Sequence, residues 1–279
     1  MNLKSLLSVF LLLLSTSTFC QTALVYNNKG LKLSKKGMYD RAILFYKKAI
    51  SADPDYAAPY ANIGLIEKIK KKYPEAIVLF GKAIDIDSTG EDAYLTYMYR
   101  GQCLLELNEY TLAIKDFTKS IDLNTENYTI YFEKGYANAM LKNYENVKQD
   151  FSIYLKHYPD EKMVHINLAN VERILGNTQY SLQMHNTLIK KYPNEYLLFN
   201  NRAEVYLDLK DFSNAMKDIN RALILKDRYA IGNFVKSKIY FKMNEISEAC
   251  TYYNKALQYG LETNDDDDDE LSEIQSQCK

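Results

Sequence analysis

The sequence predicts an all-α protein in which pairs of antiparallel helices stack into a solenoid. One spaced set of residues occurs seven times along the 279 residues, and five of the six intervals between sets are 34 residues long. Within each set, aromatic and small residues keep fixed offsets, as expected for helices that pack repeatedly in the same way. The small residues that anchor the seven sets are Gly30, Gly64, Gly101, Gly135, Ala169, Ala203 and Ser237.

Each repeat is predicted to contain two helices. If the anchor is position 8, repeat 1 begins at residue 23; large residues, mostly aromatic, take positions 4, 17 and 24, and small ones take 8, 20 and 27. This spacing predicts that large side chains of one helix fill the notch left by small residues of the other. Position 24 is occupied in turn by Tyr46, Phe80, Phe117, Phe151, His185, Ile219 and Tyr253.

Departures from the pattern locate loops and poorly fitting repeats. The one irregular interval, from Gly64 to Gly101, carries three extra residues, which we expect in the loop around Ser88 to Glu91. Helix-stopping prolines occupy position 32 at Pro54, Pro159 and Pro193. Repeats 5 and 7 fit worst, because polar residues take core positions at His165, Ser181, His185, Asn233 and Ser237.

Repeat 1 resembles the tetratricopeptide repeat, whose pattern is a large residue, Gly, a large residue, Ala, an aromatic residue, Ala and Pro. It is matched here by Tyr26, Gly30, Leu33, Ala42, Tyr46, Ala49 and Pro54. The resemblance covers residues 23–261 and implies a right-handed superhelical solenoid of seven repeats, forming a domain over residues 21–261. It also implies a concave groove, lined by positions 2, 5, 6, 9, 12 and 13 of each first helix, that holds a protein or peptide ligand.

Residues 1–20 have the composition of a secretory signal peptide. An apolar run from Leu6 to Leu14 precedes small polar residues, and the segment is too short to span a membrane convincingly. Cleavage after Cys20 would make Gln21 the first mature residue. The alternative is a lipidated Cys20, the only membrane contact we consider, but the bulky Phe19 before it disfavours that reading. We expect an exported protein, periplasmic or secreted rather than an outer-membrane lipoprotein.

Three cysteines remain after the predicted cleavage. Cys103 is expected inside a helix near core positions, Cys250 in the last repeat and Cys278 at the end of the chain. In an oxidising compartment two cysteines can pair, so we predict a bridge from Cys250 to Cys278 that fastens the C-terminal segment to the solenoid. The alternative is two free thiols, because sequence does not set disulfide geometry.

Residues 262–279 are predicted to form an acidic loop followed by a capping helix. The run from Asp265 to Glu270 is expected to be solvated, since like charges repel. A calcium loop is disfavoured because Glu270 stands where such a loop needs Gly. The helix would cover the open apolar face of repeat 7 with Leu271, Ile274 and Cys278.

Position 6 of the implied groove supplies the main candidate binding residues. Asparagine fills it in four of seven repeats, at Asn28, Asn62, Asn167 and Asn201. Asparagine is a poor helix former, but its amide both donates and accepts, so a ladder of amides can bind the backbone of an extended peptide. This resembles the asparagine ladder of superhelical sugar-transferase repeats. The alternative is polar filler that faces solvent.

Other groove positions add an apolar wall and isolated charges in repeats 4 to 7. The apolar candidates are Phe132, Tyr136, Met163, Ile166, Leu197, Ile231 and Phe234, and the basic candidates interspersed with them are Lys68, Arg173 and Lys238. Exposed apolar residues on such a face indicate a partner. Some chaperone cofactors clamp acidic C-termini with Lys, Asn and Arg side chains at fixed groove positions of three repeats. Asn62 matches one of these positions, but Asn27, Leu31, Leu95 and Tyr99 occupy the others, so this function is not supported.

No catalytic site, metal site or cofactor is predicted. The three histidines lack metal-type spacing, although His165 and His185 can meet inside repeat 5, and no phosphate loop or nucleophile motif occurs. The basic residues form no stripe, which disfavours nucleic acid. We therefore predict an exported, non-enzymatic scaffold for protein–protein interaction. The alternative is an extracytoplasmic carbohydrate-binding component.

Overall fold

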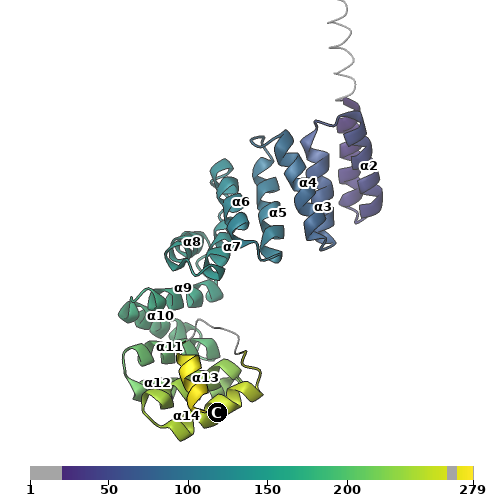
Figure 1. The fold of residues 1–279 in the computed structure, drawn as a ribbon. Coiled ribbons are helices and arrows are strands. Elements are labelled where there is room, and N and C mark those ends of the chain that lie inside the picture. Colours follow the sequence, from purple (N-terminus) through teal and green to yellow (C-terminus); the bar gives the residue numbers. More distant parts are fainter. Residues whose placement is uncertain (1–20, 263–268, 279) are drawn as a thin grey trace, which may run out of the picture. The chain divides into compact units, whose positions relative to one another are not determined.

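The computed structural model of the chain describes residues 21–262 and 269–278 (Figure 1). The predicted signal peptide and most of the acidic run lie outside these residues. The chain divides into two compact units, called here the N-terminal unit (Met1–Tyr154) and the C-terminal unit (Leu155–Lys279). All regular secondary structure in the described ranges is helical, which confirms the predicted fold class.

Seven helix pairs follow one another in the described residues, and a last helix stands alone. In the N-terminal unit they are the helical residues 21–34, α2 (Tyr39–Ala52), α3 (Ala57–Ile69), α4 (Tyr73–Ile86), α5 (Ala93–Glu106), α6 (Tyr110–Leu123), α7 (Thr129–Met140) and α8 (Tyr144–His157), whose final residues belong to the other unit. In the C-terminal unit they are α9 (Lys162–Ile174), α10 (Thr178–Lys191), α11 (Tyr196–Asp208), α12 (Phe212–Leu225), α13 (Ala230–Lys242), α14 (Ile246–Gln258) and α15 (Asp269–Gln277).

One turn geometry reverses the chain inside every repeat. Position 15 has a left-handed backbone with φ between 58° and 82° in all seven repeats, at Gly37, Lys71, Asn108, Lys142, Gly176, Lys210 and Asn244. The next residue donates its backbone N–H to the carbonyl five residues earlier, as Lys72 does to Glu67 (2.9 Å). This is the hydrogen bond of a Schellman motif, which satisfies a carbonyl at the end of the first helix.

Glycine and a ring pack against each other in the first four repeats. A Cβ atom added to Gly101 would lie 2.7 Å from the ring of Phe117, and one added to Gly135 would lie 2.6 Å from Phe151. Phe117 is fully buried. The absence of a side chain at position 8 therefore makes room for the aromatic residue at position 24.

Repeats 5 and 7 replace this contact with a hydrogen bond between the two helices. In repeat 5 the hydroxyl of Ser181 donates to the carbonyl of Ala169, and in repeat 7 Ser237 donates to Ala249, both at 2.7 Å. The two serines stand at opposite positions, 20 and 8, so the bond crosses the same helix contact in opposite directions. Ser181 and Ser237, two of the polar residues that make these repeats fit the pattern poorly, thus have partners in the core.

Buried ion pairs join the two helices of three repeats, a feature that the sequence analysis missed. Arg100 donates two hydrogen bonds of 2.7 Å to Asp116. Lys134 pairs with Asp150 at 2.9 Å, and Arg202 and Asp218 form the third pair; the three aspartates are buried. A base followed sixteen residues later by Asp was the signal in the sequence.

The three extra residues of repeat 2 lie in the loop between α4 and α5, where they were predicted. Asp87 organises this loop by accepting backbone hydrogen bonds from Thr89 (3.1 Å) and Gly90 (2.7 Å). Because the loop contains the three extra residues, α5 keeps the same repeat positions as the first helices of the other repeats.

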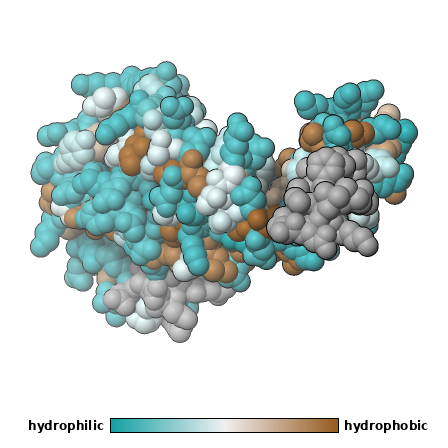
Figure 2. All heavy atoms as spheres, turned by 90° about the horizontal axis from the view of Figure 1, so that it is seen from above, coloured by the Kyte–Doolittle hydropathy of each residue, from teal (hydrophilic) through white to brown (hydrophobic). Residues whose placement is uncertain are grey.

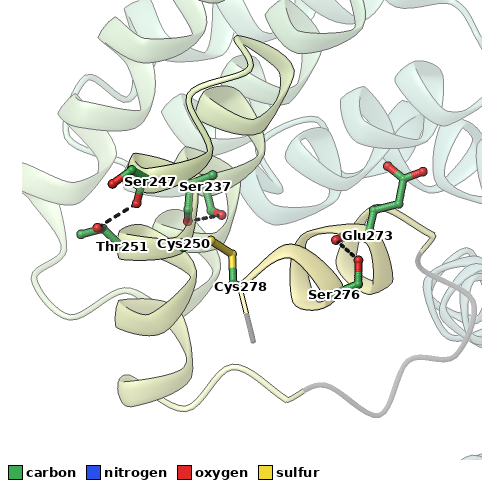
Figure 3. The surroundings of a disulfide bond; sticks show 8 residues. Ser237, Ser247, Cys250, Thr251, Glu273, Ser276 and Cys278 are labelled. Carbon is green, nitrogen blue, oxygen red and sulfur yellow. Dashed lines mark hydrogen bonds between the residues drawn. A yellow bond between two sulfur atoms is a disulfide. The ribbon is translucent and has the colours of Figure 1, made fainter.

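The last helix packs on repeat 7. Leu271 and Ile274 of α15 are buried with Phe234, Tyr253 and Ala256. The structure also brings Cys278 to Cys250 of α14, with the two Cα atoms 5.1 Å apart, a separation suited to a disulfide (Figure 3). The formation of this bridge stays a prediction. No helix in the described part of the chain has the length and apolar character needed to cross a membrane.

Candidate binding groove

The first helices of repeats 1 to 3 enclose an open hollow of about 810 Å³ in the N-terminal unit. Residues 21–34, α3 and α5 supply its walls, and Asn28 and Asn62 both line it, as do Leu31, Leu65, Leu95, Tyr56 and Tyr99. We call this hollow the amide groove. Two of the four predicted position 6 asparagines therefore lie on one surface, together with the tyrosine that takes this position in repeat 3.

Asn27, at position 5, links the amide groove into a hydrogen-bond relay. Asn62 donates its amide N–H to the Oδ1 of Asn27 (3.0 Å), and Asn27 donates to the hydroxyl of Tyr56 (3.2 Å). Asn27 is buried, whereas Asn28 is exposed. The relay fixes the orientation of two amides on adjacent repeats. The sequence analysis built its asparagine ladder from position 6 and did not include Asn27 in it.

The rim of the amide groove is acidic. Four exposed carboxylates line it, from Asp55 after α2 and from Asp87, Glu91 and Asp92 in the loop before α5. No lysine or arginine of the described chain lines this hollow. The groove therefore presents amides on its floor and net negative charge at its edge.

A second hollow, of about 690 Å³, lies one helical turn further along α3 and α5 in the same unit. It is lined by Lys68 of α3, by Gln102 of α5 and by Phe132, Glu133 and Tyr136 of α7, among others. We call it the aromatic hollow. Phe132 and Tyr136, both predicted groove residues, are 38% and 47% exposed here. The ring of Phe132 also packs 6.1 Å from that of Phe151, which holds it in place.

Two buried acceptor atoms in the aromatic hollow lack a donor. Gln102 donates to one carboxylate oxygen of Glu133 (2.6 Å), but the second oxygen of Glu133 and the amide oxygen of Gln102 are buried without a hydrogen-bond partner. Burial raises the pKa of Glu133, and the Gln102 hydrogen bond and the charge of Lys68 act in the opposite direction. Buried acceptors of this kind cost free energy unless a donor reaches them.

The groove positions of the C-terminal unit carry a paired ladder of charges. Arg173 contacts Glu204 (3.3 Å) and Asp208 (3.0 Å), and Lys238 contacts the same Glu204 (3.2 Å) and Glu270 of α15 (3.6 Å). The charge of Arg173, a predicted groove residue, is therefore neutralised within the chain. These residues line a hollow of about 500 Å³ in which bases alternate with acids.

The remaining predicted groove residues are distributed unevenly. Asn167 is exposed, and Asn201 is half-buried and accepts a hydrogen bond from Asn200 (3.3 Å). The predicted apolar wall is only partly correct. Met163 and Ile231 are exposed, but Ile166 is 1% exposed, because it packs among Ala169, Leu188 and Leu198, and Phe234 is 7% exposed, because α15 covers it. Figure 2 shows apolar residues reaching the surface in separate patches on a largely hydrophilic exterior.

The two histidines considered as a metal pair have separate partners. His165 contacts the carbonyl of Pro159 (2.8 Å), whereas His185 is fully buried and donates from Nδ1 to the carbonyl of Ser181 (2.9 Å). Burial lowers the pKa of His185 to about 4. The described residues contain no group of three side chains placed to hold a metal ion.

Comparison with known families identifies the repeat. Two family models of the tetratricopeptide repeat match this chain, one over residues 23–56 and the other over residues 96–127, 197–227 and 232–259. No functionally curated protein matches the chain.

Solved structures of repeat proteins share the fold. A tetratricopeptide repeat protein from Parabacteroides merdae is 22% identical over 92% of this chain and 99% of its own, with a TM-score of 0.58. The C-terminal part of a repeat protein from Cytophaga hutchinsonii is 15% identical over 88% and 98%, with a TM-score of 0.61. YrrB, a repeat protein with an unusual peptide-binding site, is 16% identical over 67% and 95%, with a TM-score of 0.61.

Proposed function

Because the chain is a tetratricopeptide repeat protein, we propose that it is an exported interaction scaffold that binds an extended peptide in the amide groove. The observation that carries this proposal is the relay from Asn62 through Asn27 to Tyr56 on the floor of an open hollow. An extended peptide exposes one N–H and one C=O per residue, and fixed amides can pair with both. YrrB, whose structure is similar, is described by its peptide-binding site.

Ordering of the groove before binding supports the same assignment. The amides of Asn27 and Asn62 are already held by intramolecular hydrogen bonds, so a ligand does not have to immobilise them. Preorganisation of this kind lowers the entropic cost of association. In the C-terminal unit the charged groove residues Arg173 and Lys238 both form ion pairs with Glu204, so they are less available to a ligand.

The experiment is a quantitative pull-down from envelope extract with residues 21–279 as bait. The test variant carries Asn28→Ala and Asn62→Ala, and the matched control carries Asn167→Ala and Asn201→Ala at the same position in the C-terminal unit. We expect the test variant to lose its partner by about tenfold, on the basis of two lost hydrogen bonds, and the control to retain it. Equal retention by both variants, with unchanged helicity, would contradict the amide groove as the binding surface.

Export is a separate part of the proposal, and the mature N-terminus tests it. Intact mass and N-terminal sequencing of the protein from its native host should give a chain that begins at Gln21. A chain that begins with a lipid-modified Cys20 would mean that the protein is exported but anchored to a membrane. Retention of Met1 in the bulk of the protein would contradict export.

Carbohydrate binding is the second candidate, and the aromatic hollow favours it. Phe132 and Tyr136 expose their rings beside a hollow of about 690 Å³, and sugar rings pack on such faces. Enrichment of glycans on the bait, abolished by Phe132→Ala with Tyr136→Ala and unaffected by Asn28→Ala with Asn62→Ala, would favour this candidate over the peptide.

A further inference from the structure

We infer that the ligand of the N-terminal unit is a basic segment, an extended peptide that carries arginine or lysine side chains. The inference rests on the proposed function and adds the chemistry of the partner. It follows from the charges around the amide groove and from the unpartnered acceptors in the aromatic hollow.

The charges at the amide groove are unusual for this chain. The whole sequence is nearly balanced, with 35 basic and 36 acidic side chains. Asp55, Asp87, Glu91 and Asp92 nevertheless line the groove without a basic neighbour, and no ion pair joins any of them to a base in the described residues. A cleft lined by one sign of charge attracts ligands of the opposite sign.

The C-terminal unit shows what the same groove positions look like when their charges are satisfied. There Glu204 contacts both Arg173 and Lys238, and Glu270 contacts Lys238 and Lys242. Each acid of that ladder has a base from the chain itself. The exposed acids of the amide groove have no base from the chain beside them, so their charge is open to solvent and to a basic ligand.

The aromatic hollow indicates where one basic side chain of the ligand would lie. The free oxygen of Glu133 and the amide oxygen of Gln102 are both acceptors, and both are buried without a donor. Both oxygens are shielded from solvent in this structure, so a guanidinium group, with five N–H donors in a planar fork, would reach them only after the Gln102 and Glu133 side chains rearrange. Lys68 and Lys71 also line this hollow, but no ion pair joins either of them to Glu133.

One extended segment can reach both hollows. Leu65 and Tyr99 line the amide groove, and Lys68 and Gln102, each three residues further along α3 and α5, line the aromatic hollow. Three residues of a helix rise about 4.5 Å, whereas an extended peptide advances about 3.3 Å per residue. Neighbouring parts of one peptide would therefore contact the two sites. The acidic run of this chain has the wrong charge for either.

Synthetic peptides test the inference with the purified protein. Three N-acetylated decapeptides of alanine and serine would differ only at three spaced positions, occupied by arginine, by citrulline or by glutamate. Citrulline keeps the shape of arginine without its charge. We expect the arginine peptide to bind at least about fivefold more tightly than the citrulline peptide, as a few exposed ion pairs allow. The glutamate peptide should bind most weakly.

Neutral variants of the rim locate the effect. The test variant carries Asp55→Asn, Glu91→Gln and Asp92→Asn, and a second variant carries Glu133→Gln. The matched control removes the same charge from exposed positions outside both hollows, through Glu126→Gln, Asp227→Asn and Glu248→Gln. The rim variant should bind the arginine peptide several-fold more weakly and lose most of its salt dependence, whereas the control should bind as the parent does.

The possible failures can be told apart. If the citrulline peptide binds as tightly as the arginine peptide, and Asn28→Ala with Asn62→Ala weakens both, the peptide groove stands and its basic preference is wrong. An unchanged affinity in the rim variant also overturns the preference. If no peptide binds and the pull-down yields no partner, both the preference and the proposed function are wrong.

Discussion

The two units build the same helix pair from different side chains. In the N-terminal unit the contact between the helices of a repeat is a glycine against an aromatic ring, as at Gly101 and Phe117. In the C-terminal unit repeat 6 uses Ala203 and Ile219, and repeats 5 and 7 use a serine hydroxyl that bonds to the facing backbone. The fold therefore accepts different residues at this contact, either a glycine against a ring, two aliphatic side chains or a serine bonded to the facing backbone.

The groove surfaces of the two units also differ in their side chains. The N-terminal unit keeps open hollows with fixed amides and with acids that no base of the chain pairs. Buried polar atoms without a partner occur in both units, at Gln102 and Glu133 in one and at His185 and Asn200 in the other. The C-terminal unit pairs its groove charges internally and lays α15 over Phe234. These differences are the reason for placing the proposed binding surface in the N-terminal unit; in the C-terminal unit α15 covers repeat 7.

The largest expected effect is a loss of stability on reduction that is confined to the C-terminal unit. If Cys250 and Cys278 are bridged, reduction should lower the free energy of unfolding of the C-terminal unit by about 3 kcal/mol, given a sequence separation of 28 residues between the cysteines. Hydrogen exchange before and after reduction measures this, with the N-terminal unit as the internal control. Equal free-thiol counts before and after reduction would mean that no bridge exists.

The next effect is a pH dependence confined to repeat 5. The pKa of His185 is about 4 in the folded protein because the ring is buried, against 6.5 ordinarily. The unfolded chain therefore binds a proton first as pH falls, and stability declines from about pH 6.5 to about pH 4, by roughly 3 kcal/mol in total. Urea titrations across this range should show the decline, and His185→Ile, which copies repeat 6, should remove most of it. An equally steep decline in the variant would place its cause elsewhere.

A smaller effect tests whether the side chains at positions 8 and 24 compete for the same space between the helices. Gly101→Ala gains about 1 kcal/mol of helix propensity, but its Cβ would overlap Phe117, and overpacking costs about 1–3 kcal/mol. We expect net destabilisation. Adding Phe117→Ile, the combination of repeat 6, should give a favourable coupling of about 1 kcal/mol in a double-mutant cycle measured by chemical denaturation. Simple additivity would show that the two positions are independent.

The smallest effect concerns the turns. Lys210 has φ of 58° where the equivalent residue of repeat 5 is Gly176. A left-handed backbone costs a residue other than glycine about 1 kcal/mol, so Lys210→Gly should stabilise the protein by about 0.5 kcal/mol once the flexibility of glycine is counted. Gly176→Ala should destabilise it by a similar amount. Thermal melts of both variants, compared with the parent, measure the pair. A lower melting temperature for Lys210→Gly together with a higher one for Gly176→Ala would refute this account of the turn.

The repeat order made most of the fold predictable. A period fixes where each helix begins, so even repeats 5 and 7, with Ser181 and Ser237 in core positions, were placed correctly. The site was harder to predict. Position 6 identified Asn62, but not its bond to Asn27, which depends on the rotamers of side chains 35 residues apart. Arg173 looked available because its partners, Glu204 and Asp208, lie in the next repeat and were not considered together.

Hydrogen exchange with and without the arginine peptide is the most direct test of the central claim, that ligands bind the N-terminal unit. The account predicts slower exchange at the ends of α3, α5 and α7 that border the amide groove and the aromatic hollow, with no change in α9, α11 and α13. Protection of α9, α11 and α13 instead, or of all six helices equally, would contradict it.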